Sequence, residues 1–126
     1  MKRALLIVDH GSRKPDAHVH LLWVAEQVRR RRPDLPVYVA HMELSQPSIQ
    51  QAIDACVADG VEELLVHPFF LVPGLHAAED VPRLVDAAAL AHPRLRVRVT
   101  ESTGSVAGIA DLILATVPTD RRPLND

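Results

Sequence analysis

The chain has 126 residues, of which 48% are hydrophobic and 24% charged, and its formal net charge is −2. The length is typical of one domain, and this mixture of apolar and charged residues is unlike that of disordered chains. The near-neutral charge does not favour nucleic-acid binding, which needs a strongly basic face. No apolar run reaches the roughly 18 residues of a membrane span.

The single cysteine and the N-terminal residues exclude further classes of protein. The single cysteine, Cys56, excludes an internal disulfide and a cysteine-rich zinc site. Polar residues from Asp9 onward interrupt the N-terminal apolar run before a signal peptide could form. We therefore expect a cytoplasmic protein with neither a nucleic acid nor a membrane as partner.

The first three predicted elements follow one another closely. Leu5 to Val8 is a short continuous apolar run, typical of a buried strand. A helix is expected to begin at Pro15 or Asp16 and to end at the four arginines 29–32, which complement the helix dipole as a solvated end. Val37 to Glu43 then predicts a second strand.

The second predicted helix has the clearest amphipathic pattern. Ser45 is its expected N-cap, Pro47 is expected in its first turn and Gly60 just after its end. One apolar face is formed by Ile49, Ala52, Ile53, Cys56 and Val57. Cys56 is therefore expected to be a buried small hydrophobic residue.

In the second half of the chain, predicted strands and helices again follow one another in turn. A third strand is predicted over 64–71, followed by a loop over 73–76 and a helix that includes 84–89. Residues 95–100 alternate between apolar and polar, as in an edge strand, and Ser105 is expected to cap a last helix that runs to Val117. We expect one domain over residues 1–117 and a polar tail over 118–126.

Strands that alternate with helices predict an α/β fold, with helices on both faces of a parallel sheet. The continuous first and third strands are expected at the centre, and the alternating fourth strand at an edge. The expected fold is a single doubly wound, three-layer, flavodoxin-like domain with four parallel strands in the order 2-1-3-4. Ligands of such sheets bind at the carboxyl ends of the first and third strands.

Three candidate metal ligands follow the first three strands. His10, Glu43 and His76 are separated by 33 residues each, so all three are expected at the same edge of the sheet. Two imidazoles and one carboxylate suit Fe²⁺, Co²⁺, Ni²⁺ or Zn²⁺ and leave positions open on the metal. A histidine after a strand can instead cap a backbone group, and both roles remain open at this point. Gly11 is expected in a tight turn and Ser12 as a cap, with Arg13 placed to meet an acidic ligand.

The other histidines are weaker candidates. His18 and His20 lie two apart on a helix and do not face each other. His41 shares a strand face with Glu43 and is expected to support it. His67 is expected to be hydrogen-bonded in the third strand or at its rim, and His92 to lie solvated at a helix end.

Several motifs in order resemble the small sirohydrochlorin chelatases, the single-domain branch of the class II chelatases. The segments are Leu6 to Arg13, Met42-Glu43 followed by 47–49, 67–71, 74–76 and 80–82, and the resemblance extends from about residue 4 to about residue 114. It implies a chelatase (a lyase) that inserts Co²⁺ or Fe²⁺, or Ni²⁺ in archaeal relatives, into sirohydrochlorin for cobalamin or sirohaem synthesis. The metal is then a substrate, and no permanently bound cofactor is expected.

The resemblance implies that His10, Glu43 and His76 bind the metal and carry the catalysis. Gly11, Ser12 and Arg13 are expected to bind the substrate carboxylates. Asp9 stands where relatives usually have a small residue, and a carboxylate there is expected to orient His10 or to alter metal preference. The segment 101–106 also lacks the proline-histidine pair of many members.

Two other classes of function remain as alternatives: a non-catalytic carrier of the metal or tetrapyrrole, and a flavodoxin-like nucleotide-binding module. The second would use Gly11 and Ser12 as an anion site, but the chain has only five glycines and no GxGxxG motif. Because one four-stranded layer supplies one wall for a macrocycle, we also expect a homodimer whose clefts face each other.

Overall fold

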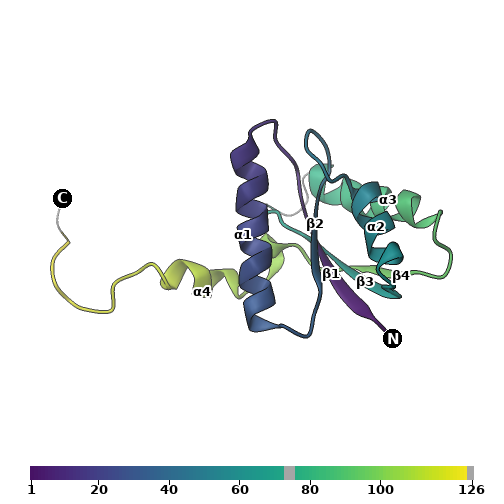
Figure 1. The fold of residues 1–126 in the computed structure, drawn as a ribbon. Coiled ribbons are helices and arrows are strands. Elements are labelled where there is room, and N and C mark those ends of the chain that lie inside the picture. Colours follow the sequence, from purple (N-terminus) through teal and green to yellow (C-terminus); the bar gives the residue numbers. More distant parts are fainter. Residues whose placement is uncertain (73–75, 125–126) are drawn as a thin grey trace.

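Strands and helices alternate along the whole chain (Figure 1). The computed structural model describes residues 1–72 and 76–124, and gives only the backbone for 76–78. The elements are β1 (Arg3–Asp9), α1 (Pro15–Arg31), β2 (Val37–His41), α2 (Ile49–Ala58), β3 (Glu63–Pro68), α3 (His76–Ala89), β4 (Arg96–Val99), the 3₁₀ turn η1 (Thr103–Ser105) and α4 (Ile109–Leu114).

The four strands form one parallel sheet in the predicted order β2-β1-β3-β4. β1 pairs with both β2 and β3, so that Leu5 lies opposite Val37 on one side and opposite Leu65 on the other. The alternating strand β4 pairs only with β3 among the described strands and is an edge, as its sequence predicted. The α/β class and the strand order are therefore confirmed.

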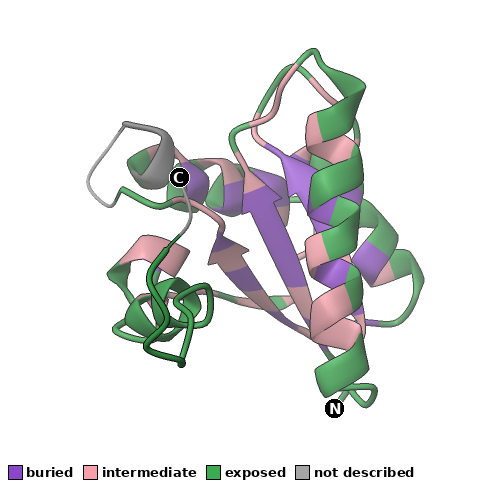
Figure 2. Cartoon of the chain, turned by 90° about the vertical axis from the view of Figure 1, so that its left-hand side faces the viewer, coloured by how far each residue is buried: buried purple, intermediate pink, exposed green. Residues whose placement is uncertain are grey.

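Helices cover both faces of the sheet, as expected (Figures 1 and 2). On one face α1 packs over β1 and β2 through Leu21 and Ala25. On the other face α2 and α3 bury a larger cluster, to which the strands contribute Ala4, Leu6, Val8, Leu64 and Val66. Cys56 belongs to this cluster and is fully buried, as predicted. Burial raises the pKa of its thiol to about 12.

The beginning of α2 differs from the prediction. Ser48, not Ser45, is the N-cap: its hydroxyl accepts the backbone N–H of Gln51, and the Gln51 side chain accepts the N–H of Ser48. This reciprocal capping box satisfies two donors that a helix leaves without a partner. Pro47 consequently lies before the helix rather than in its first turn. Gly60 follows the helix with φ +88°, as predicted.

Strands two and three are shorter at their carboxyl ends than predicted. β2 ends at His41 rather than Glu43, and Leu44 then turns the chain with φ +69°. β3 ends at Pro68 rather than Leu71. Its neighbour β1 ends at Asp9, so the backbone beyond Phe69 has no strand left to pair with among the described elements. Of the loop expected over 73–76, residues 73–75 lie outside the described residues, and His76 begins α3 instead of belonging to the loop.

The C-terminal part departs most from prediction. Ser105 belongs to η1 and does not cap α4, whose N-cap is Gly108. α4 ends at Leu114 instead of Val117 and projects from the body of the domain rather than lying on the sheet (Figure 1). The proposed division between a domain at 1–117 and a tail at 118–126 remains a prediction. No helix in the described part of the chain is long and apolar enough to cross a membrane.

Candidate functional site

Two of the three predicted metal ligands meet at the carboxyl edge of the sheet. His10 follows β1 directly, Glu43 lies two residues beyond β2, and His10 Nε2 is 2.9 Å from Glu43 Oε1. Both side chains are about half exposed, at 54% and 57%. Ligand atoms bound to one divalent ion at roughly 2.0–2.2 Å lie about 3 Å apart, so this separation suits a shared ion.

The third predicted ligand is placed only by its backbone. His76 begins α3, which follows β3 at the same edge, and its side chain is outside the described residues. Among the side chains that the structure describes, no three His, Cys, Asp or Glu residues are close enough to hold a metal ion together. The described part of the site is therefore the His10–Glu43 pair.

Gly11 allows the two ligands to approach each other. Its φ is +99°, which favours glycine, and a Cβ at this position would lie 1.8 Å from the carbonyl oxygen of Glu43. The Glu43 N–H in turn donates to the His10 carbonyl at 3.2 Å. The expected tight turn is thus confirmed, and it permits a close approach between the segments that carry the two ligands.

Ser12 braces the same turn without being the N-cap of α1. Its hydroxyl accepts the backbone N–H of Lys14 at 3.1 Å, and Lys14 is the N-cap. The Ser12 carbonyl accepts a hydrogen bond from the Ser45 hydroxyl, which ties the turn to the segment after β2. Arg13 is exposed at the start of α1.

A partly buried chain of polar side chains lies beside the pair, and the sequence did not predict it. Asp9 Oδ1 is 2.5 Å from His41 Nδ1, and His41 Nε2 is 2.8 Å from His18 Nδ1. His41 is completely buried. The expected support of Glu43 by His41 is therefore wrong. His41 binds Asp9, the residue that departs from the family pattern, and the Asp9 carboxylate is directed to His41 rather than to His10.

A hollow of about 420 Å³ adjoins His10. It is lined by Asp9 to Gly11 and by the apolar residues Ala17, Phe69, Phe70, Leu71 and Val72. A mostly apolar concave surface beside a few polar groups is typical of a small-molecule site. The hollow is open to solvent, so one chain does not enclose a ligand there on all sides.

Hydrogen bonds join the segments after β3 and β4 next to this hollow. His67 Nδ1 lies 3.0 Å from the Thr100 hydroxyl, and His67 Nε2 lies 2.7 Å from the Thr103 hydroxyl. The Gly104 N–H donates to the Phe70 carbonyl at 2.8 Å, and a Cβ on Gly104 would collide with the Leu71 carbonyl. The predicted hydrogen-bonded role of His67 is confirmed, and its burial lowers its pKa.

The remaining basic candidates lie elsewhere. His18 and His20 do not face each other, as predicted: His20 stacks on Trp23, while His18 binds His41. His92 is not simply solvated, because its Nε2 lies 2.6 Å from Asp54 Oδ1 on α2. The arginines at 29–32 end α1 at the opposite edge from His10 and are occupied there by Glu26, Asp34 and backbone carbonyls.

The chain is similar in sequence to several known proteins. A family model described as CbiX matches residues 4–119. The chain is 36% identical over 100 residues to the chloroplastic sirohydrochlorin ferrochelatase of Arabidopsis thaliana, covering 79% of this chain and 44% of that protein. It is 39% identical over 82 residues to the sirohydrochlorin cobaltochelatase of Methanocaldococcus jannaschii, covering 65% of this chain and 57% of that one.

The solved structures that the chain resembles include proteins of the same kind. A putative cobalamin biosynthesis CbiX protein from Marinobacter aquaeolei superposes with a TM-score of 0.78 at 25% identity, covering 90% of this chain and 92% of that one. The sirohydrochlorin chelatase SirB of Bacillus subtilis, in complex with cobalt, superposes with a TM-score of 0.80 at 27% identity, covering 91% of this chain and 49% of that one. The chain spans about half the length of the curated relatives it matches.

Proposed function

This chain belongs to the CbiX family, and from that membership we propose that it is a chelatase, inserting Co²⁺ or Fe²⁺ into sirohydrochlorin for cobalamin or sirohaem synthesis. Its relatives are named sirohydrochlorin cobaltochelatase and ferrochelatase, and solved structures of SirB hold Fe³⁺ or cobalt. The observation in this chain that carries the proposal is the 2.9 Å approach of His10 to Glu43 beside an apolar hollow. Ni²⁺ is a third candidate metal, since the same ligands suit it.

In this proposal His10, Glu43 and His76 bind the entering metal ion. Three protein ligands leave other positions for water, and ring nitrogens replace these ligands one at a time as the ion moves into the macrocycle. The reaction consumes one divalent ion and one sirohydrochlorin and releases the two protons of the ring N–H groups. An imidazole accepts a proton readily near neutral pH, and we assign His10 as the base because it directly follows a central strand.

The substrate side of the site is assigned to the turn after β1. Sirohydrochlorin carries eight carboxylates, and Arg13 is exposed where a guanidinium can pair with one of them. The Gly11 and Ser12 backbone lies in the turn just before α1, near the helix end where the dipole favours anions. The aromatic and aliphatic side chains after β3, Phe69 to Val72, supply the apolar wall against which a planar ring can lie.

A second copy of the chain would supply the opposite wall of the site. We propose a homodimer in which the two carboxyl edges face each other, because the hollow beside His10 is open and SirB is about twice the length of this chain. The cytoplasmic location expected from the sequence belongs to the same proposal.

Metal insertion into sirohydrochlorin, followed through the absorbance of the tetrapyrrole, tests the function. His76→Ala should abolish insertion, and Glu43→Gln should weaken Co²⁺ binding more than sirohydrochlorin binding. Glu26→Gln on α1 is the matched control, since that exposed carboxylate pairs only with Arg29 and Arg30 among the described residues. Near-normal turnover by His76→Ala with a native circular dichroism spectrum would refute the site.

The number of turnovers separates the enzyme from a carrier. With a small amount of protein and excess Co²⁺ and sirohydrochlorin, an enzyme yields many equivalents of product, whereas a carrier yields at most one. The nucleotide-binding module is the weakest of the three classes, because Gly11 and Ser12 serve the turn that brings His10 to Glu43.

A further inference from the structure

The C-terminal arm, residues 106–117, exposes an unusual amount of apolar surface. Five of its six large apolar side chains are between 43% and 63% exposed, and only Ile109 is partly buried: the five are Val106, Leu112, Ile113, Leu114 and Val117. Among the regular elements, α4 contacts chiefly the neighbouring turn η1. Scattered exposed leucines are common, but a continuous helix of them marks a surface that another surface covers.

On the side of the sheet that α1 covers in part, the area formed by β3 and β4 is left uncovered, and we call this area the bare face. On β3 the side chains that face α2 and α3 are buried, whereas Glu63, Leu65 and His67 on the opposite side are only half buried. Of the described helices, α1 packs over β1 and β2 on that side (Figure 2), and no residue of α4 belongs to the buried clusters of the described chain. Two adjoining hollows of about 210 and 650 Å³ lie over this bare face, and both include Arg3, Leu65 and Arg98.

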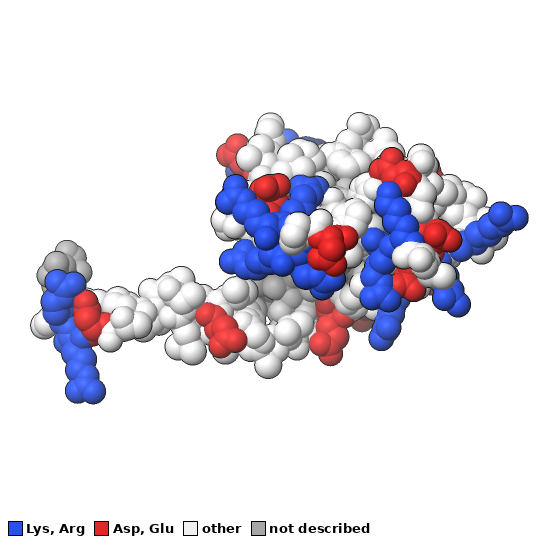
Figure 3. Space-filling view, turned by 60° about the horizontal axis from the view of Figure 1, so that its bottom comes forward, with Lys and Arg blue, Asp and Glu red and all other residues white. Residues whose placement is uncertain are grey.

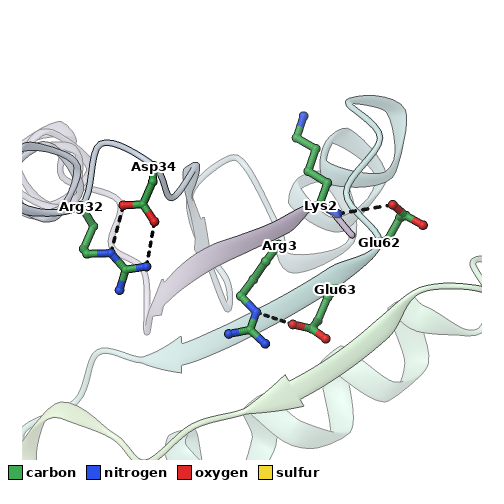
Figure 4. Close-up of polar contacts among 6 residues, drawn as sticks. All are labelled: Lys2, Arg3, Arg32, Asp34, Glu62 and Glu63. Atoms are coloured by element: carbon green, nitrogen blue, oxygen red, sulfur yellow. Dashed lines mark hydrogen bonds and ion pairs between the residues drawn. The ribbon is translucent and has the colours of Figure 1, made fainter.

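The charges on the bare face and on the arm are complementary. Arg3 is paired with Glu63 on the face (Figure 4), but Arg96 and Arg98 make no ion pair with any residue that the structure describes. The only charged residue of the arm is Asp111. Figure 3 shows the arm as a mostly uncharged rod that projects from a body carrying both Lys and Arg and Asp and Glu side chains.

The position of the arm's first residue connects the two surfaces. Val106 lines the larger hollow together with Thr100 and Glu101, so the arm begins at the rim of the bare face. From there α4 leads away from its own sheet (Figure 1). The arm therefore starts beside a groove that it does not fill. It leaves from the carboxyl edge of β4, the same edge of the sheet that carries His10 and Glu43.

We propose that two copies of this chain exchange their arms, so that residues 106–117 of each copy lie in the groove over β3 and β4 of the other. The exchange buries Leu112 and Ile113 against Leu65 and places Asp111 near Arg96 and Arg98. Such an exchange closes with two-fold symmetry, because each copy gives one arm and receives one. It rests on the homodimer of the proposed function and specifies what holds the two copies together.

Sedimentation velocity of matched variants tests the role of the arm. The unaltered chain should sediment as a dimer, and the double variant Leu112→Asp/Ile113→Asp should raise the dimer dissociation constant by at least about a hundredfold, since two apolar anchors are lost. Leu90→Asp is the control, because Leu90 is an 83% exposed leucine outside the arm and should leave the dimer intact. Circular dichroism confirms that each variant is folded.

Disulfide trapping shows in which chain the arm lies. Leu65→Cys and Ile113→Cys are made as separate variants and coexpressed; the native Cys56 is buried and should not compete. A covalent dimer that joins one variant to the other supports the exchange, with Leu90→Cys in place of Ile113→Cys as the negative control. In the double variant of one chain, a disulfide that forms within the monomer would overturn it, because the arm would then cover its own sheet.

The outcomes also separate this inference from the proposed function. A dimer that survives Leu112→Asp/Ile113→Asp, or a trapping experiment without a covalent dimer, overturns the arm exchange and leaves the chelatase assay unaffected. A monomeric unaltered chain overturns both the exchange and the homodimer, while tetrapyrrole absorbance still decides whether metal insertion occurs.

Discussion

Gly11→Ala should destabilise the fold and damage the site together, because only a residue without a side chain lets the two ligand-bearing segments meet at this position. Its backbone has φ +99°, and a residue with a Cβ in a left-handed conformation costs about 1–2 kcal/mol. In addition, the new methyl group would lie 1.8 Å from the Glu43 carbonyl oxygen, so that backbone must move. Forced overpacking of this kind costs roughly a further 1–3 kcal/mol.

The expected loss of unfolding free energy is therefore about 2–5 kcal/mol, measured by urea unfolding. Gly60→Ala is the internal control, because Gly60 has φ +88° but nothing lies within 4 Å of the position that its new methyl group would take. It should lose only the conformational part, about 1–2 kcal/mol. Calorimetric titration with Co²⁺ should show weaker binding in Gly11→Ala alone. If both variants lose the same free energy, the close approach to Glu43 is refuted.

Three further predictions concern other contacts. Burial lowers the pKa of His67, so its neutral form is favoured in the folded state and stability should fall as pH drops below the unfolded value of about 6.5. His67→Gln should flatten that fall in urea titrations at pH 7 and 5, and an unchanged slope would contradict the assignment. Burial, followed by the hydrogen bond to Asp59, holds the pKa of Tyr38 well above its usual range, so this single tyrosine should show little phenolate absorbance at pH 10.5 while the chain is folded. Ser48→Ala should cost about 1 kcal/mol in thermal unfolding by breaking the capping box with Gln51, and a neutral result would argue against the box.

Local sequence signals predicted the elements better than their ends. The apolar run of β1, the stripe of α2 and the alternation of β4 each indicated the right type of element, because burial on one or two faces imposes a period on the sequence. The start of α2 was misplaced because both Ser45 and Ser48 precede its apolar stripe, and only Ser48 has Gln51 three residues later to complete the box.

The sequence also predicted part of the candidate site. His10 and Glu43 follow adjacent parallel strands, so topology alone brings them to one edge, and the structure places them 2.9 Å apart. The partners of His41 were not predictable, since Asp9 and His18 come from different elements and a shared strand face pointed to Glu43 instead. A histidine on the predicted second strand, two residues before a candidate ligand, was the available signal, and it pointed to the wrong partner.

The parallel α/β sheet, its strand order and the edge at which the candidate ligands gather could all be inferred from the residues alone, because they follow from hydrophobic period and from the direction of the connections. The partner of each polar side chain, and what the C-terminal residues cover, became visible only in the folded chain. Side-chain pairing depends on distances of a few ångströms between segments far apart in the chain, as with His67 and Thr103. The apolar pattern of α4 predicted a helix, but only the packed sheet shows that its own domain leaves it uncovered.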